Sequence, residues 1–140
     1  LKAIGISNFD VHDMENLLAH ADVSPAANQI QYYVGFTEPT ITAFAKDHGL
    51  LVEAYSPLAT GDMLDNVDVR TIADANHVSP AQVALRFCLQ NDVLPLPKAV
   101  SPDHMRANAE LNFDLSPEEM SLLQGLPDAA PQHFHYSTQG

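Results

Sequence analysis

The sequence comprises 140 residues, which is the size of one domain or of part of one. Hydrophobic residues make up 46% of the chain, enough for a buried core, which excludes a largely disordered protein. Six basic and 18 acidic residues give a formal net charge of −12, which disfavours nucleic acid as a partner. No apolar run has the length of a membrane span and no leader-like segment opens the chain, so we expect a cytoplasmic protein without a membrane partner.

The first half of the chain alternates short apolar runs with patterns of helical period. Three of the runs are expected to be buried strands: residues 1–6, 27–32 and 50–55. Asp10 is a suitable N-cap for a helix whose apolar side chains recur at helical spacing. Thr37 and Pro39 begin a second helix, which Gly49 ends. A loop containing proline and glycine is expected over about 56–66.

The second half continues the alternation. Helices are expected over residues 67–77 and 80–90, and a short strand over 93–97. In three places a serine can cap a helix while proline fills its first position: Ser79-Pro80, Ser101-Pro102 and Ser116-Pro117. Glu119 stands where the acid of a capping box belongs.

Strand–helix units in series predict parallel strands joined by right-handed crossovers, which makes the fold class α/β. About four strands are expected, and four are few for a parallel sheet. Opened out, they would leave two unpaired edges and one uncovered face.

Candidate functional residues lie at or near the ends of the four expected strands. Functional side chains of parallel α/β proteins gather at such strand ends. The residues at this edge are Ser7 and Asn8, Gln29, the run from Tyr55 to Leu58, and Lys98. Each has an ordinary structural interpretation, as a turn, a packed aromatic ring or a solvated charge. Their common position at one edge favours a shared binding site.

Five sequence blocks carry a resemblance to a known family: residues 3–9 (AIGISNF), 28–29 (NQ), 52–58 (VEAYSPL), 96–98 (LPK) and Asn108. In this order and at about this spacing, the chain resembles the C-terminal half of the aldo-keto reductases, from the fifth barrel strand onward. The resemblance covers nearly the whole chain and weakens after about Leu126. It implies a partial domain over residues 1–140, half of a (β/α)8 TIM barrel, with a C-terminal tail over about 127–140.

The resemblance also implies a nicotinamide cofactor, NADP or NAD, bound along the carboxyl ends of the strands. Three polar residues would hold the nicotinamide carboxamide: Ser7, Asn8 and Gln29. Tyr55 would stack against the ring. Three residues would line the pyrophosphate path: Ser56, Leu58 and Thr60. Five residues would lie at the adenosine end: Lys98, Val100, Ser101, His104 and Asn108.

Three positions at the adenosine end depart from the family pattern. Ala99 stands where the family usually has serine, His104 where it has arginine beside the 2′-phosphate, and Ala107 where it often has glutamate. Arg106 is two residues away from the arginine position and is not assigned its role. With Lys98 as the remaining point charge, we expect only a weak preference for NADPH over NADH.

The catalytic Asp, Tyr, Lys and His of the family lie in its N-terminal half, so we assign no catalytic residue to this sequence. Reduction of a carbonyl group needs a proton donor as well as hydride. We expect the chain to be the cofactor-binding part of a reductase for small carbonyl compounds, inactive alone and paired with the missing N-terminal half or with itself. Two alternatives stay open: a non-catalytic nucleotide-binding or assembly module, and a complementing half-barrel subunit.

Other candidate features are minor. Cys88, the single cysteine, lies in an apolar helical pattern and is expected to be a buried structural thiol. His133 and His135 have no nearby carboxylate or cysteine to complete a metal site, so no metal is expected. The acidic excess fits either adaptation to high salt or an ordinary acidic surface.

Overall fold

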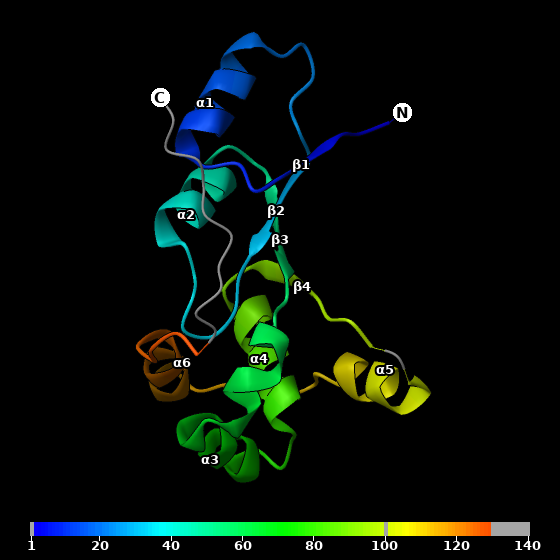
Figure 1. Ribbon diagram of the computed structural model, residues 1–140, viewed down its shortest axis with the longest axis vertical. Coiled ribbons are helices and arrows are strands. Elements are labelled where there is room, and N and C mark those ends of the chain that lie inside the picture. The colour runs from blue at the N-terminus through cyan, green and yellow to red at the C-terminus, as the bar shows by residue number, and fades with distance from the viewer. Residues whose placement is uncertain (1, 100, 130–140) are drawn as a thin grey trace.

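The fold is a parallel sheet whose connections contain helices (Figure 1). The structure is a computed structural model that describes residues 2–99 and 101–129. The strands pair in chain order, each parallel to the next: β1 (Gly5–Ser7), β2 (Ala27–Gln31), β3 (Leu51–Tyr55) and β4 (Val93–Leu96). The α/β class and the parallel strands predicted from the sequence are confirmed.

Helices follow every strand. Those between the strands are α1 (Val11–His20), α2 (Pro39–Asp47), the 3-10 helix η1 (Ala59–Asp65), α3 (Val67–Ala75) and α4 (Pro80–Gln90). Two more follow β4: α5 (Pro102–Ala109) and α6 (Pro117–Gln124). In Figure 1, α1, α2 and α6 lie to the left of the sheet and α5 lies to its right.

Most helix starts agree with the capping signals of the sequence. Three predicted caps form capping boxes, in which the cap side chain accepts from a backbone N–H three residues on: Asp10, Ser79 and Ser116. Ser101 caps α5 by accepting from the backbone N–H of His104 (3.2 Å). Glu119 has the predicted role in the last of these boxes.

Several expected boundaries differ from the structure. α2 begins at Pro39 with Glu38 as its cap residue, and Thr37, expected at the helix start, accepts a hydrogen bond at Oγ1 from Gln124 of α6 (3.1 Å). The helix expected over 67–77 ends at Ala75. β1 begins only at Gly5, and the described residues before it, Lys2, Ala3 and Ile4, are exposed and outside the ladder. The expected loop over 56–66 contains η1, which coils because its apolar side chains are drawn into the core.

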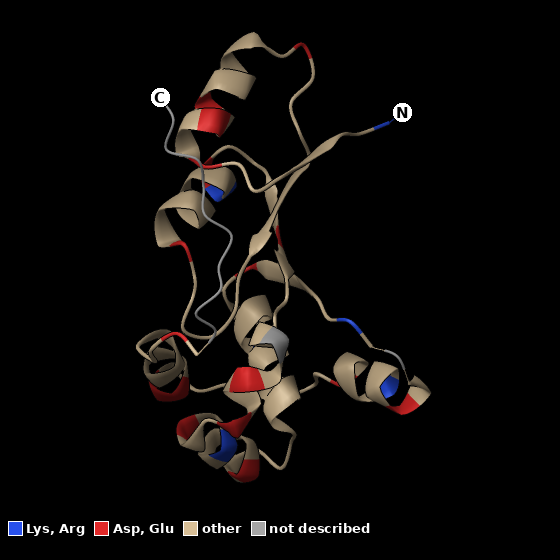
Figure 2. Ribbon diagram, viewed as in Figure 1, with Lys and Arg blue, Asp and Glu red and all other residues tan. Residues whose placement is uncertain are grey.

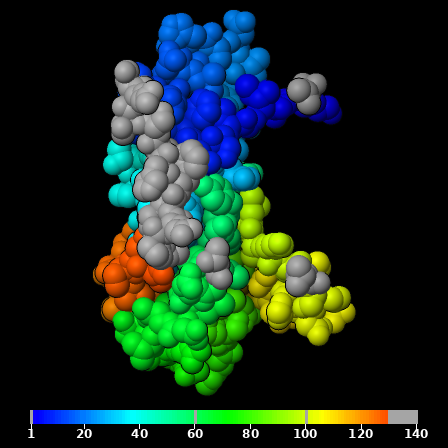
Figure 3. Space-filling view, viewed as in Figure 1, coloured from blue at the N-terminus to red at the C-terminus, as the bar shows by residue number. Residues whose placement is uncertain are grey.

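The two faces of the sheet have different surroundings. The face toward the helices is buried and carries Ile30, Val52, Ala54 and Val93. The other face carries a row of residues in register across all four strands: Ser7, Gln29, Glu53 and Leu94. Three leucines on this face are exposed: Leu51 (45%), Leu94 (39%) and Leu96 (40%). The outline of the molecule is indented between the N-terminal end and α5 (Figure 3).

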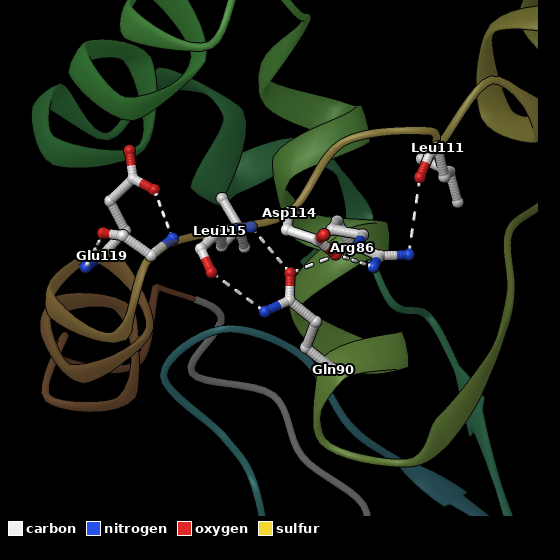
Figure 4. A network of polar contacts seen from close by, with 7 residues as sticks. Arg86, Gln90, Leu111, Asp114, Leu115 and Glu119 are labelled. Atoms are coloured by element: carbon white, nitrogen blue, oxygen red, sulfur yellow. Dashed lines mark hydrogen bonds and ion pairs between the residues drawn. The ribbon is translucent and has the colours of Figure 1, made fainter.

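A network of polar contacts fastens the connection between α5 and α6 onto α4 (Figure 4). Arg86 forms an ion pair with Asp114 and also donates to the carbonyl oxygen of Leu111 (3.4 Å). Gln90 bonds to the backbone of Leu115 twice, accepting from its N–H (2.7 Å) and donating to its carbonyl oxygen (3.0 Å). These bonds satisfy backbone groups that lie outside helices and strands.

The C-terminal part of the described chain packs against the loop between β2 and α2. Tyr33, which is fully buried, donates a hydrogen bond from its hydroxyl to Asp128 (2.7 Å). Gly35 has a positive φ of +92°, and the backbone of Pro127 lies where a side chain would begin. This contact therefore requires glycine at position 35.

Charge is distributed unevenly over the molecule. In Figure 2, acidic segments occur on most helices, whereas basic segments are few and well separated. Within the described residues, no helix is both long and apolar enough to cross a bilayer.

Candidate functional site

The carboxyl ends of β1, β2 and β3 bring four predicted residues together: Ser7, Asn8, Gln29 and Tyr55. The backbone N–H of Asn8 (2.9 Å) and the hydroxyl of Ser7 (3.1 Å) both donate to the carbonyl oxygen of Gln29. The Tyr55 hydroxyl donates to Oδ1 of Asn8 (3.0 Å). Burial raises the pKa of Tyr55, and its bond to Asn8 offsets part of that shift. We call these four residues the strand-end cluster.

The strand-end cluster keeps unused hydrogen-bonding capacity. Gln29 donates from Nε2 to Glu53 (3.0 Å), which leaves its Oε1 without a partner among the described residues. Asn8 uses Oδ1 as an acceptor, and its Nδ2 likewise has no partner within the described chain. Ser7 donates its proton to Gln29, so the lone pairs of its Oγ stay available. The cluster therefore offers one amide donor and two oxygen acceptors to a ligand.

The backbone is strained where β1 and β3 end. Asn8 has a φ of +56° and Ser56 a φ of +52°, both in the left-handed region. Asparagine adopts this conformation fairly often, but serine does so rarely. Such a residue costs on the order of 1–3 kcal/mol and persists only where its surroundings hold it, which is typical of binding sites.

A cleft of about 310 Å³ lies beside α5. It collects four predicted residues from separate segments: Leu58, Lys98, His104 and Asn108. Leu64, Ser79, Ala81 and Ala107 complete its wall. Its volume is within the usual range of small-molecule sites, and its lining is mostly apolar with a few polar groups. We call it the α5 cleft.

The other predicted residues have separate positions. Ser56 follows β3 and leads toward Leu58 of the α5 cleft. Ser101 caps α5, so its Oγ already accepts one hydrogen bond. Thr60 lies within η1. Val100 lies outside the described residues.

Comparison with known proteins gives the family. The sequence model of the Aldo/keto reductase family matches residues 1–68 and 62–128. The chain belongs to this family. The resemblance read from the five sequence blocks is thereby confirmed.

The matches to individual relatives extend over most of this chain. Glyoxal reductase of Bacillus subtilis (strain 168) is 38% identical over 127 residues, which are 90% of this chain and 46% of that protein. Glycerol 2-dehydrogenase (NADP(+)) of Saccharomyces cerevisiae (strain ATCC 204508 / S288c) is 34% identical over 129 residues, 89% of this chain and 41% of that protein. The chain thus spans about half the length of the curated relatives it matches.

Solved aldo/keto reductases have the same fold over the matched part. The aldose reductase of Schistosoma japonicum superposes with a TM-score of 0.88 at 35% identity, covering 95% of this chain and 44% of its own. The aldo-keto reductase of the silkworm, Bombyx mori, was solved in complex with NADPH. Its complex superposes with a TM-score of 0.85 at 28% identity, covering 91% of this chain and 43% of its own. A partial TIM barrel is therefore confirmed as the fold class.

Two polar residues of this chain support the strand-end cluster, although the sequence analysis gave them no role. Asn28 is fully buried on the helix side of β2. It donates from Nδ2 to the carbonyl oxygen of Phe9 (3.0 Å) and accepts from the N–H of Phe9 (3.5 Å), which positions the loop carrying Asn8. Glu53 orients the amide of Gln29. A polar residue inside a buried strand was the available signal for Asn28.

The sequence analysis named three further candidate side chains: Cys88, His133 and His135. Cys88 is buried, as predicted, and burial raises its pKa to about 12. The described residues contain no group of three side chains able to hold a metal ion. His133 and His135 lie outside the described residues.

Proposed function

We propose that this chain provides the cofactor-binding side of an NAD(P)-dependent aldo-keto reductase acting on small aldehydes, ketones or alcohols. The observation that carries the proposal is spatial. Residues expected at the nicotinamide end form one hydrogen-bonded cluster, and three of the five residues expected at the adenosine end, Lys98, His104 and Asn108, line one cleft. The yeast relative named for NADP(+) and the silkworm relative solved with NADPH support a phosphorylated cofactor.

The strand-end cluster fits a nicotinamide carboxamide by its free hydrogen-bonding groups. The unused Nδ2 of Asn8 is a donor for the carboxamide oxygen. The Oε1 of Gln29 and the Oγ of Ser7 are acceptors for the carboxamide NH2 group. Tyr55, tied to Asn8, offers its ring for stacking. Together these side chains would fix the ring face from which a bound cofactor supplies hydride.

The α5 cleft fits the adenosine end. Lys98 and Asn108 supply a cation and an amide to a mostly apolar wall that includes Leu58. In the proposed path the pyrophosphate crosses from the strand-end cluster past Ser56, Leu58 and Thr60. Val100 and Ser101 are proposed to flank the adenosine end at the start of α5.

His104 sets the proposed cofactor preference. It lines the α5 cleft where the family usually places arginine. Arginine binds a phosphate with a planar fork of donors, which histidine lacks. With Lys98 as the remaining charge, the protein discriminates weakly between NADPH and NADH.

A binding experiment tests this preference. Affinities for NADPH and NADH are measured at pH 8 for the natural protein, for His104→Arg and for Arg106→Gln as a control on a neighbouring cation. His104→Arg should raise the affinity for NADPH by about 10- to 100-fold and leave NADH unchanged, the usual effect of one charge-assisted contact. If the natural protein binds NADPH about a thousandfold more tightly than NADH, the result contradicts the proposal.

Catalysis needs a proton donor, which the residues proposed to bind the cofactor do not supply. Hydride transfer to a carbonyl group is accompanied by protonation of its oxygen, and general acid catalysis is commonly worth about 10²–10⁴-fold. We propose that the proton donor comes from the family's N-terminal half, so the 140-residue chain alone is inactive. The assay is NADPH oxidation with a reactive aldehyde. Turnover by the chain alone approaching about 1 per second, and lost in Tyr55→Ala, would contradict this assignment.

The exposed sheet face supports pairing with another half-barrel, either the missing N-terminal half or a second copy. Its three exposed leucines, and the row of residues in register from Ser7 to Leu94, face away from the chain's own helices. Leaving apolar area in water costs roughly 25 cal/mol per Å². Sedimentation of the isolated chain should show association, and a dilute monomer that melts cooperatively would contradict the pairing.

A further inference from the structure

A groove with several polar residues in its lining lies away from the proposed cofactor site. It has a volume of about 390 Å³ and runs along one face of α2, between that helix, the residue that follows α4 and the last turn of α6. It shares no described residue with the α5 cleft. In Figure 1, α2 and α6 lie to the left of the sheet and α5 to the right. We call it the α2 groove.

Tyr32 is the unusual residue of the α2 groove. Its side chain lines the groove, is only 3% exposed, and stacks on Phe87 with 6.3 Å between ring centroids. Its hydroxyl has no hydrogen-bond partner among the described residues. A buried polar group without a partner normally destabilises the folded state, so its retention needs an explanation. The neighbouring Tyr33 shows the usual arrangement, because its hydroxyl is bonded to Asp128.

Three polar groups of the α2 groove can donate to a ligand, while Asn91 and Gln124 add amide oxygens to its wall. Lys46 donates to the carbonyl oxygen of Asn91, and an ammonium group has three N–H bonds. Thr37 accepts from Gln124, so its own hydroxyl proton is available. Burial raises the pKa of Tyr32, so its hydroxyl also keeps its proton and can donate. The groove therefore matches a ligand that is rich in oxygen acceptors.

The spacing of these donors defines the ligand further. Lys46 lies in the last turn of α2 and Thr37 lies before its first turn. The two donors therefore lie near opposite ends of α2, which suits an extended ligand better than a compact one. Lys46 is the only cation among the described residues of the lining, and the protein has a net charge of −12, so a single negative charge is favoured.

We propose that the α2 groove binds a small hydroxycarboxylate monoanion. The ammonium of Lys46 pairs with the carboxylate, and the hydroxyls of Tyr32 and Thr37 donate to oxygens along the chain of the ligand. This site is independent of the cofactor site and of the proposed reduction.

The proposal is tested by titrating gluconate into the full-length protein. Calorimetry measures the binding, and amide chemical shifts locate it. Glucitol is the neutral counterpart of the probe. Tyr32→Phe removes only the unpartnered hydroxyl, and Lys46→Gln removes the charge. Tyr33→Phe and Lys2→Gln make the same chemical changes outside the groove.

Gluconate should bind saturably and change the amide chemical shifts of α2. Glucitol should bind at least about tenfold more weakly, because it lacks the charge-assisted contact of the carboxylate. Tyr32→Phe should weaken gluconate about three- to tenfold and Lys46→Gln about tenfold or more, while both control variants leave the affinity unchanged. Absence of saturable binding, equal binding of glucitol, or full affinity in Tyr32→Phe would overturn the proposal.

A stability measurement without ligand provides an independent readout. If the Tyr32 hydroxyl is kept for a ligand, Tyr32→Phe should melt at the natural temperature or above it, since the change removes no hydrogen bond to the part of the chain that the structure describes. Tyr33→Phe should melt lower, because it loses the bond to Asp128. A loss in Tyr32→Phe equal to that in Tyr33→Phe would overturn the proposal, because the hydroxyl would then have a partner in the free protein.

Discussion

Replacing Gly35 with alanine tests how the C-terminal segment is held against the loop between β2 and α2. A Cβ at Gly35 would lie 2.7 Å from the carbonyl oxygen of Pro127 and 3.2 Å from Cα of Asp128. These are backbone atoms, which cannot turn aside as a flexible side chain can. The segment must therefore shift, and the hydrogen bond from Tyr33 to Asp128 shifts with it.

The expected loss has two parts. Alanine at a φ of +92° costs about 1–2 kcal/mol, as L-residues do in left-handed conformations. Displacing a packed segment adds about 1–3 kcal/mol, the usual range for overpacking. Gly61 separates the two parts, because it has a φ of +104° but no atom within 4 Å of its added Cβ. Gly61→Ala should therefore show the first part alone.

Urea denaturation of both variants gives the free energies of unfolding. We expect Gly35→Ala to lose at least about 1 kcal/mol more than Gly61→Ala. Addition of Tyr33→Phe to Gly35→Ala should cost less than the same change in the natural chain, because the bond to Asp128 is already weakened. Equal losses in the two glycine variants would refute the claim that the segment is held by this close approach.

Three other changes test the fold around the site. Asn28→Ala should lower the free energy of unfolding by about 2–4 kcal/mol, because the backbone of Phe9 loses its buried partner; urea denaturation measures this. Arg86→Ala should lower the melting temperature by several degrees by releasing the connection before α6, whereas Arg106→Ala, with an exposed ion pair, should leave it unchanged. Cys88 keeps its proton in the folded chain up to a pKa of about 12 but ionises near its ordinary 9.0 when unfolded, so stability should fall as pH rises through that interval. Cys88→Ala should reduce this slope by about 1.4 kcal/mol per pH unit in pH-dependent unfolding, and an unchanged slope would contradict the assignment.

Local signals predicted most of the fold. The Ser-Pro pairs located three helix starts, because capping involves only neighbouring residues. The apolar runs located the strands to within a few residues, and the common edge of parallel strands placed Ser7, Gln29 and Tyr55 together. The family resemblance predicted a common position for Lys98, His104 and Asn108, and these three residues line one cleft. They are remote from the strand-end cluster in sequence.

The features that sequence reasoning missed depend on distant contacts. The bond between Thr37 and Gln124 joins residues 87 positions apart, so no pattern of neighbouring residues signals it. The contact of Tyr33 with Asp128 spans 95 positions. Tyr32 is adjacent to Tyr33 and chemically identical to it, so no local pattern separates the bonded hydroxyl from the unpartnered one. Only the packed structure separates them.

A sheet whose strands pair in chain order closes short loops as it forms. The register partners Ser7 and Gln29 are 22 positions apart, and Gln29 and Glu53 are 24 apart. Loop closure becomes more costly with length, and β4 joins β3 only after η1, α3 and α4 have intervened. Amide protons of β2 should therefore become protected earlier during refolding than those of β4. The nicotinamide end of the proposed site would then be assembled at an earlier stage of folding than the adenosine end.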